Sequence, residues 1–176
     1  MNVNITIPEG IHVSCENGRL AVRGPKGEIY RTFPPAIGLS LNGNTITLSS
    51  VSDRRKQKAT LYTWKAHFAN LFTGVTKGWE AKMKIVYLHF PIKFSVEKDT
   101  VHVGNFLGEK SPRIATLVSG VTVKLDKDTV TITGTDKEAV GNQCGIIEST
   151  TVIRNRDRRV FSDGIWLTQP PQPISN

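Results

Sequence analysis

Residues 13–28 read VSCENGRLAVRGPKGE, and residues 94–109 read FSVEKDTVHVGNFLGE. At an offset of 81 positions, the two stretches share the residues at positions 14 and 95, 16 and 97, 27 and 108, and 28 and 109. The agreement continues downstream, where residues 44–48 (NTITL) resemble residues 128–132 (DTVTI). A period of about 80 residues is too long for a solenoid repeat, which spans about 20–50 residues. We therefore predict two copies of one small domain.

Each copy is predicted to form short antiparallel strands followed by a helix. Alternating apolar residues and turn signals predict strands at residues 11–13, 20–23, 29–33, 37–41 and 45–48 of the first copy, with a hairpin turn at Asn17-Gly18. The corresponding strands of the second copy are predicted at residues 92–96, 100–104, 114–118, 121–125 and 129–133. The fold class is therefore α+β, with two tandem related domains, each an antiparallel sheet with one helix packed across it.

Helical spacing of apolar residues places the two helices at about residues 53–73 and 136–152. Asp53 and Asp136 are suited to begin them because a short carboxylate accepts the unpaired N–H groups of the first turn. We predict a first domain at 1–80, a second at 81–168 and a Pro-rich extended tail at 169–176. A linker at about residues 78–90 is expected between the domains, basic at its start through Lys77, Lys82 and Lys84.

The charge of the chain points to a polyanionic partner. The formal net charge is +8, and the pI is about 9.7. The charge is uneven, because residues 1–88 carry a net charge of +7 and residues 89–176 only +1. The second half is nevertheless locally basic at residues 154–159, which read RNRDRR.

Several classes of protein are disfavoured by what the sequence lacks. Cys15 and Cys144 have no second cysteine or histidine at metal-ligand spacing, so we expect no disulfide framework, zinc site or other cofactor. No motif of a hydrolase elbow, phosphate-binding loop or metalloprotease helix is present, so we expect no enzyme. Neither a signal-peptide core nor a membrane-spanning stretch is present, so we expect an intracellular protein with no membrane partner.

Basic residues gather at predicted loops and helix ends, where side chains reach outward and can meet phosphates. The candidates in the first half are Lys26 of the predicted turn, Arg54, Arg55 and Lys58 at the helix start, and Lys77 at the linker. The candidates in the second half are Lys110 and Arg113 of the segment KSPR, and Arg154, Arg156, Arg158 and Arg159 of the segment RNRDRR. The strands lack the aromatic signature that stacks single-stranded bases. We therefore predict recognition of folded RNA through its shape, phosphates and 2′-hydroxyl groups.

Three segments in a fixed order resemble one known family. They are RGPKGE at residues 23–28, VGNFLGEK at 103–110 and IRNRDRRVFSDGIW at 153–166. Together they resemble the large-subunit ribosomal protein L-six family, in its archaeal and eukaryotic branch, which is called L-nine in eukaryotes. The resemblance extends from Ile5 to about Leu167. The tail after Leu167 is short and Pro-rich, which departs from family members with a longer C-terminus.

The resemblance implies a structural protein of the large ribosomal subunit with two related α+β domains and no catalytic activity. Its implied partners are large-subunit rRNA near the sarcin-ricin loop and stalk base, neighbouring ribosomal proteins, and translation GTPases docked nearby. Its implied location is the cytoplasmic ribosome, with a nucleolar stage during assembly in a eukaryote. The implied RNA-facing residues are Arg23, Lys26, Asn105, Lys110, Arg154, Arg156, Arg158 and Arg159, with Gly24, Gly27 and Gly108 as turn formers.

Two other functions remain compatible with the residues alone. A protein–protein adaptor could use the same basic surfaces to bind acidic partners, and it predicts little preference for RNA over an acidic polypeptide. A small hydrolytic enzyme could combine Cys15 or Cys144 with a histidine, which requires a reactive, accessible thiol.

Overall fold

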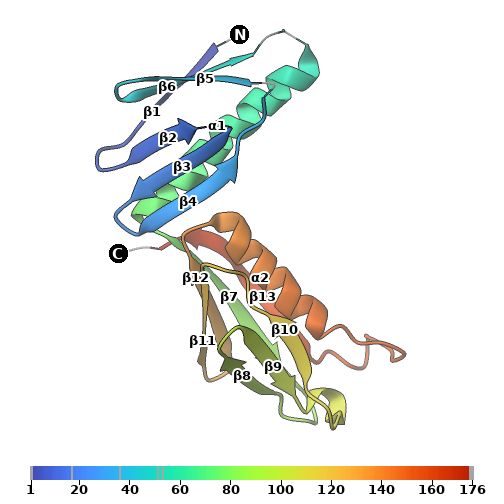
Figure 1. Ribbon diagram of the computed structural model, residues 1–176. Helices are drawn as coiled ribbons and strands as arrows, with labels where there is room; N and C mark the ends of the chain where they lie inside the picture. The colour runs from blue at the N-terminus through green and yellow to red at the C-terminus, as the bar shows by residue number, and fades with distance from the viewer. Residues whose placement is uncertain (1, 17, 36, 51, 53, 175–176) are drawn as a thin grey trace. The chain divides into compact units, whose positions relative to one another are not determined.

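The computed structural model describes residues 2–174 except residues 17, 36, 51 and 53. The chain divides into two compact units, unit 1 at Met1–Gly78 and unit 2 at Trp79–Asn176 (Figure 1). Each unit has its own hydrophobic core. The described residues form antiparallel sheets and α-helices, which confirms the predicted α+β class. Within each unit the strands divide between two antiparallel sheets, where we had predicted one.

The strands of unit 1 are β1 (Asn2–Thr6), β2 (His12–Glu16), β3 (Arg19–Gly24), β4 (Gly27–Thr32), β5 (Ile37–Asn42) and β6 (Thr45–Ser50). They pair in the orders β1-β6-β5 and β2-β3-β4. The helix of the unit is α1 (Arg55–Thr76), which contacts strands of both sheets. Alternate residues of the central strands point inward and are fully buried, as Leu20 and Val22 of β3 are.

Helix α1 covers these strands with one apolar face that includes Leu61, Phe68 and Phe72. It begins at Arg55 and ends at Thr76, which is close to the predicted range. Asp53, the predicted N-terminal cap, lies outside the described residues, and so does Asn17 of the predicted hairpin turn.

The strands of unit 2 are β7 (Trp79–Val86), β8 (Lys93–Glu97), β9 (Thr100–Gly104), β10 (Arg113–Thr116), β11 (Val121–Asp126), β12 (Thr129–Gly134) and β13 (Gly164–Pro173). They pair in the orders β10-β9-β8 and β11-β12-β7-β13. A short 3-10 helix, η1 (Phe106–Gly108), follows β9, and α2 (Lys137–Thr150) contacts all four strands of the larger sheet. Asp136 occupies the N-terminal cap of α2 as predicted, and its carboxylate accepts a hydrogen bond from Glu138 N at 3.0 Å.

Two segments that we had predicted as linker and tail are strands. Residues 79–86 of the predicted linker form β7, which lies between β12 and β13 and buries Trp79, Ala81, Met83 and Ile85. Residues 169–173 of the predicted tail continue β13 and pair with β7 through shifts in register. The prolines are accommodated because β13 is an edge strand with shifts in register, and edge strands and bulges are the places in a sheet where proline is tolerated.

The turn between β3 and β4 packs tightly on the C-terminal end of α1. Lys26 N donates a hydrogen bond to Val75 O at 2.9 Å. A Cβ atom added at Gly24 would lie 2.7–2.9 Å from the Cγ2, Cβ and carbonyl oxygen atoms of Val75. Glycine is therefore required at Gly24 by the close approach of helix and turn.

Gly24→Ala is expected to lower the free energy of unfolding by about 1–3 kcal/mol, because the helix and the turn must separate to admit the methyl group. Gly145→Ala provides the matched control, because Gly145 lies inside α2 with nothing within 4 Å of its Cβ position. That substitution is expected to raise the free energy of unfolding by about 0.5–1 kcal/mol through helix propensity. Urea unfolding followed by circular dichroism measures both, and equal effects of the two variants would contradict the packing.

Candidate nucleic-acid interface

In unit 1 the exposed Lys26 at the tip of the β3–β4 turn has an internal partner. Its Nζ donates a hydrogen bond to the carbonyl oxygen of Lys77, just beyond the C-terminus of α1. A cation is favourable there, because the helix dipole places negative partial charge at that end. Lys26 therefore helps hold the turn to the helix, in addition to presenting its charge.

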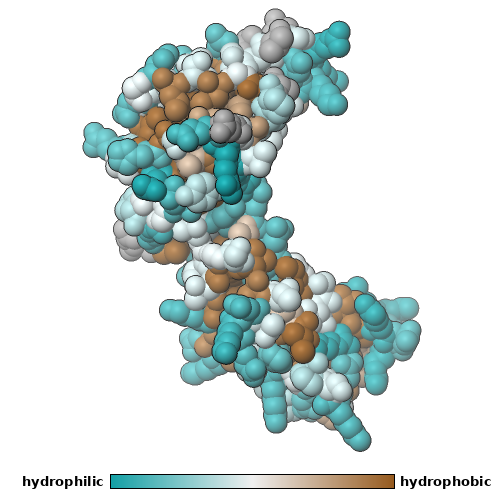
Figure 2. Space-filling model, viewed as in Figure 1, coloured by the Kyte–Doolittle hydropathy of each residue, from teal (hydrophilic) through white to brown (hydrophobic). Residues whose placement is uncertain are grey.

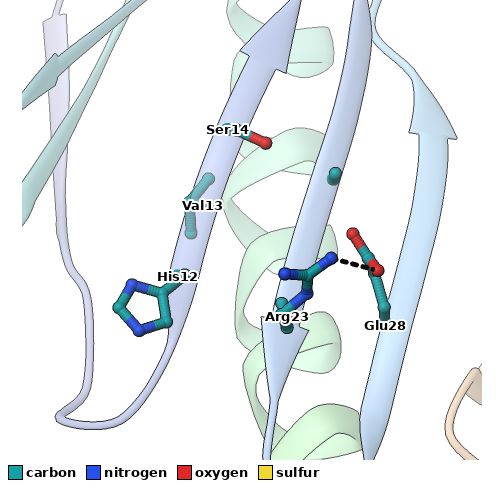
Figure 3. A pocket seen from close by; sticks show the side chains of 6 residues that line it. His12, Val13, Ser14, Arg23 and Glu28 are labelled. Atoms are coloured by element: carbon teal, nitrogen blue, oxygen red, sulfur yellow. Dashed lines mark hydrogen bonds and ion pairs between the residues drawn. The ribbon is translucent and has the colours of Figure 1, made fainter.

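Arg23 lies beside this turn on the solvent-facing side of the β2-β3-β4 sheet. Figure 3 shows its guanidinium directed at Glu28, and the two groups form an ion pair at 2.9 Å. The hydrogen bond from Arg23 lowers the pKa of Glu28, although the Arg23 side chain remains 67% exposed. The hollow around the pair, of about 180 Å³, is lined by His12, Val13, Ser14, Ala21, Arg23 and Glu28. It is smaller than the roughly 300–1,000 Å³ typical of ligand pockets.

The other predicted RNA-facing residues of unit 1 lie at opposite ends of α1. Arg54, Arg55 and Lys58 are exposed at its N-terminal end, and Lys77 is exposed just after its C-terminal end. A helix of 22 residues is about 33 Å long. Lys77 and Lys26 are therefore neighbours at one end of α1, connected by the hydrogen bond described above. Arg54, Arg55 and Lys58 lie at the other end of the helix.

In unit 2, residues 105–110 form a loop that we call the η1 loop. Asn105 is half-buried, and its Nδ2 donates a hydrogen bond to Pro91 O at 3.0 Å. Asn105 (φ 59°), Leu107 (φ 51°) and Gly108 (φ 79°) all have left-handed backbone. Lys110 at the end of the loop is exposed. Asn105 thus shapes the loop with its side-chain amide, and Lys110 extends from it into solvent.

Arg113 follows the η1 loop and is largely enclosed, with its side chain 24% exposed. Its Nε and Nη2 donate to the two carboxylate oxygens of Glu109 at 2.9 and 2.6 Å. Its Nη1 donates to the carbonyl oxygens of Thr150 and Val152 at 2.8 and 2.9 Å. The guanidinium also lies 4.3 Å from the centre of the Phe106 ring. These contacts commit the donors of Arg113 to the protein, so its main role is to tie the η1 loop to the end of α2.

The segment between α2 and β13, residues 152–163, is called the arginine loop here. Arg154, Arg156, Arg158 and Arg159 are all exposed in it. The loop is closed at its base by a hydrogen bond of 3.1 Å from Ile165 N to the buried Thr151 hydroxyl.

A turn at Asp157 organises the middle of the arginine loop. The Asp157 carboxylate accepts a hydrogen bond from Arg159 N at 2.9 Å, and the Asp157 carbonyl oxygen accepts one from Phe161 N at 3.0 Å. The guanidinium groups of Arg156 and Arg158 lie 5.0 and 5.9 Å from the centres of the Phe161 and Trp166 rings, respectively. These aromatic contacts support the arginine side chains from below and leave their outer N–H groups available to phosphate.

The η1 loop and the arginine loop lie at the same end of unit 2, where α2 ends (Figure 1). The hydrogen bonds from Arg113 lower the pKa of Glu109, and the charge of Arg156 lowers it further. A groove of about 450 Å³ is lined there by Arg113, Ile114, Ser149, Thr150, Val152 and Arg154. We call Lys110, Arg154, Arg156, Arg158 and Arg159 the basic end of unit 2.

Sequence reasoning missed the residues that hold this surface together. Glu109 pairs with Arg113, and Phe161 and Trp166 lie beneath arginines. The spacing of four residues between Glu109 and Arg113 is the one signal that could have predicted the ion pair. Arg113 was predicted to face RNA because its charge is visible in the sequence and its internal acceptors are not.

The thiol of Cys144 does not suit the hydrolytic alternative. Cys144 lies in α2 with 2% of its surface exposed, and burial raises its pKa to about 11. Such a thiol stays protonated near neutral pH and is a poor nucleophile.

In the described part of the chain, neither α-helix is long and apolar enough to cross a membrane.

Comparison with known proteins gives one consistent match for both halves of the chain. Residues 7–78 and 90–164 match the sequence model described as ribosomal protein L6. The protein named large ribosomal subunit protein uL6 of Methanobrevibacter smithii is 46% identical over 164 residues, which cover 93% of this chain and 92% of that protein. The protein of the same name from Ignicoccus hospitalis is 44% identical, and the match covers 93% of this chain and 91% of that protein. The one from Haloarcula marismortui is 39% identical, and the match covers 96% of each chain.

Proposed function

Because the chain belongs to the ribosomal protein L6 family, whose members are structural and not enzymatic, we propose that it is a constituent of the large ribosomal subunit that binds folded rRNA. The bound rRNA lies near the sarcin-ricin loop and the base of the stalk. The protein supports the region where translation GTPases dock and contacts neighbouring ribosomal proteins in the cytoplasmic ribosome. The resemblance of the RGPKGE, VGNFLGEK and RNRDRR segments supports this location.

The observation that carries the proposal is the basic end of unit 2. Five cationic side chains are exposed on two loops that Arg113 ties to the end of α2. Their exposure suits a surface that meets phosphates, and two of them, Arg156 and Arg158, lie over the rings of Phe161 and Trp166. Each phosphate neutralised by a lysine or arginine releases condensed counterions, which favours binding and makes it salt-dependent.

The predicted RNA-binding residues fall into two groups. Those proposed to contact RNA directly are exposed, namely Arg23, Arg54, Arg55, Lys58, Lys77, Lys110, Arg154, Arg156, Arg158 and Arg159. Lys26, Asn105 and Arg113 hold loops in place through hydrogen bonds to the protein, as Gly24, Gly27 and Gly108 do through their backbone. The second group is expected to affect binding mainly through the shape of the loops, and the exposed Lys26 also presents its charge.

Directed hydroxyl-radical cleavage tests the proposed location. A cysteine is placed at Arg158 in a chain whose Cys15 and Cys144 are replaced by alanine, and an iron chelate is attached to it. After assembly into large subunits, cleavage of rRNA in the sarcin-ricin region and the stalk base is expected. The same chelate at Lys124, exposed on β11, serves as the control for another part of unit 2. Cleavage only at distant rRNA segments would overturn the proposed location.

A further inference from the structure

The loop between β7 and β8 exposes an unusual run of apolar side chains. Tyr87, Leu88 and Phe90 are 41%, 56% and 47% exposed, and His89 between them is exposed too. Large aromatic and aliphatic groups that cluster on a surface mark interaction sites more often than single exposed residues do. Figure 2 shows apolar groups beside hydrophilic ones on the visible face of unit 2.

The η1 loop holds this apolar loop in place. The amide of Asn105 donates to the carbonyl oxygen of Pro91 at 3.0 Å, next to Phe90. The Phe90 ring carbons Cζ, Cε1 and Cε2 lie 3.3–3.5 Å from the position that a Cβ of Gly108 would occupy. One end of the ring therefore rests on the glycine, and about half of the residue remains exposed to solvent.

The backbone that supports Phe90 is strained. Leu107 has a φ of 51°, in a region that branched and bulky side chains avoid. It stands between Asn105 and Gly108, which also have positive φ. Such conformations persist where the surrounding structure enforces them, and they gather at functional sites. The surrounding structure thus holds this backbone in the conformation against which the end of the Phe90 ring packs.

The charges around this platform select the kind of partner. Lys110 follows Gly108 by two residues, and Arg156 lies near enough to Glu109 to lower the pKa of that carboxylate. The Glu109 carboxylate itself is paired with Arg113. An aromatic ring that packs on the η1 loop, which carries the exposed Lys110, matches a nucleotide, because a nucleotide offers a π-face and a phosphate together. An apolar protein segment would use the ring but leave the cations without partners.

We propose that Phe90 stacks on an unpaired base of the rRNA bound at the basic end of unit 2. The proposal rests on the proposed function and extends it. It adds a contact with an RNA base to the basic end of unit 2, for which only phosphate contacts are proposed above. Unpaired bases in loops and bulges of folded RNA are commonly held on aromatic side chains. Asn105 and Gly108 act in this account as positioning residues for the Phe90 ring.

The test compares Phe90→Ala and Phe90→Leu in the full chain, with binding to a large-subunit rRNA fragment measured over a range of potassium chloride concentrations. Phe90→Ala is expected to weaken binding by about 10-fold or more. Phe90→Leu keeps an apolar side chain without a π-face and is expected to lose most of the same affinity. Because stacking releases no counterions, the salt dependence stays that of the wild type, whereas Lys110→Ala reduces the salt slope by about one.

Tyr62→Ala is the matched control, because Tyr62 is a 50% exposed aromatic residue on α1 of unit 1. It is expected to leave affinity unchanged, and circular dichroism and urea unfolding check that every variant is folded. Chemical probing of the complexes is expected to show an unpaired nucleotide that loses protection in both Phe90 variants and keeps it in Tyr62→Ala. Wild-type affinity of Phe90→Ala or of Phe90→Leu overturns the stacking proposal. Failure of the wild type itself to bind rRNA would instead overturn the proposed function.

Discussion

Replacing Arg158 and Arg159 together with glutamate is expected to weaken binding to large-subunit rRNA by about 100-fold at physiological salt. Both residues are exposed, and the Arg159 side chain is 93% exposed, so the change removes two cations and adds two anions on the surface proposed to meet phosphate. The slope of affinity against salt should fall by about 0.7–0.9 for each lost phosphate contact. The free energy of unfolding should change by less than about 0.5 kcal/mol, because exposed charges contribute little to stability.

Lys124→Glu with Lys127→Glu is the matched control, because it changes the net charge equally at an exposed hairpin of the same unit. Fluorescence anisotropy with a labelled rRNA fragment compares the two double variants. An equal loss of affinity in both would mean that only the total charge matters, and it would contradict a defined RNA-facing loop.

Replacing Arg113 with alanine is expected to lower the free energy of unfolding by about 2–4 kcal/mol. The change removes four hydrogen bonds and leaves Glu109 and the carbonyl oxygens of Thr150 and Val152 without this donor. It also removes the contact of the guanidinium with the Phe106 ring. Urea unfolding measures the loss, and RNA affinity should fall as well, because the η1 loop is no longer tied to α2.

Lys110→Ala is the control for Arg113→Ala, because Lys110 belongs to the same loop but is exposed. It should weaken RNA binding and leave the free energy of unfolding within about 0.5 kcal/mol of the wild type. The opposite pattern, with Lys110→Ala unstable and Arg113→Ala stable, would contradict the roles assigned to the two residues.

Acid pH gives a separate test of the Glu109–Arg113 pair. Arg113 lowers the folded-state pKa of Glu109 below its ordinary value of 4.5. The stabilisation by the charged pair is therefore complete at pH values above 4.5 and declines as the pH falls through the lower folded-state pKa. The difference in stability between wild type and Arg113→Ala should shrink over that acidic range. A difference that grows with acidification would contradict the ion pair.

The sequence predicted those elements whose signals are local. The strand predicted at residues 100–104 is β9 (Thr100–Gly104), and the cap predicted at Asp136 is present. The strand β7 and part of β13 were not predicted, because the amino-acid composition of these segments is typical of a linker and a tail. Lys82 and Lys84 suggested a basic linker, and the prolines after Gln169 suggested a tail. Their pairing brings together segments about 80 residues apart, and local patterns carry no information on such pairing.

The candidate interface was predictable only in outline. Charge and the resemblance to a known family pointed to the arginine loop and the η1 loop, and the structure brings them to one end of unit 2. The sequence could not distinguish Lys110, which is exposed, from Arg113, whose donors are used within the protein. That distinction depends on which acceptors the fold places within hydrogen-bond distance, which only the tertiary structure shows.

The most direct test is the dissociation constant of the purified chain for a large-subunit rRNA fragment that carries the sarcin-ricin region, measured against a folded RNA of the same composition and scrambled sequence. Titrations at several salt concentrations separate specific recognition from general basicity. Tighter binding to the native fragment is expected, by about 10-fold or more, with a steep loss of affinity as salt rises. Equal, weak binding to both RNAs would contradict it and would favour the protein–protein adaptor.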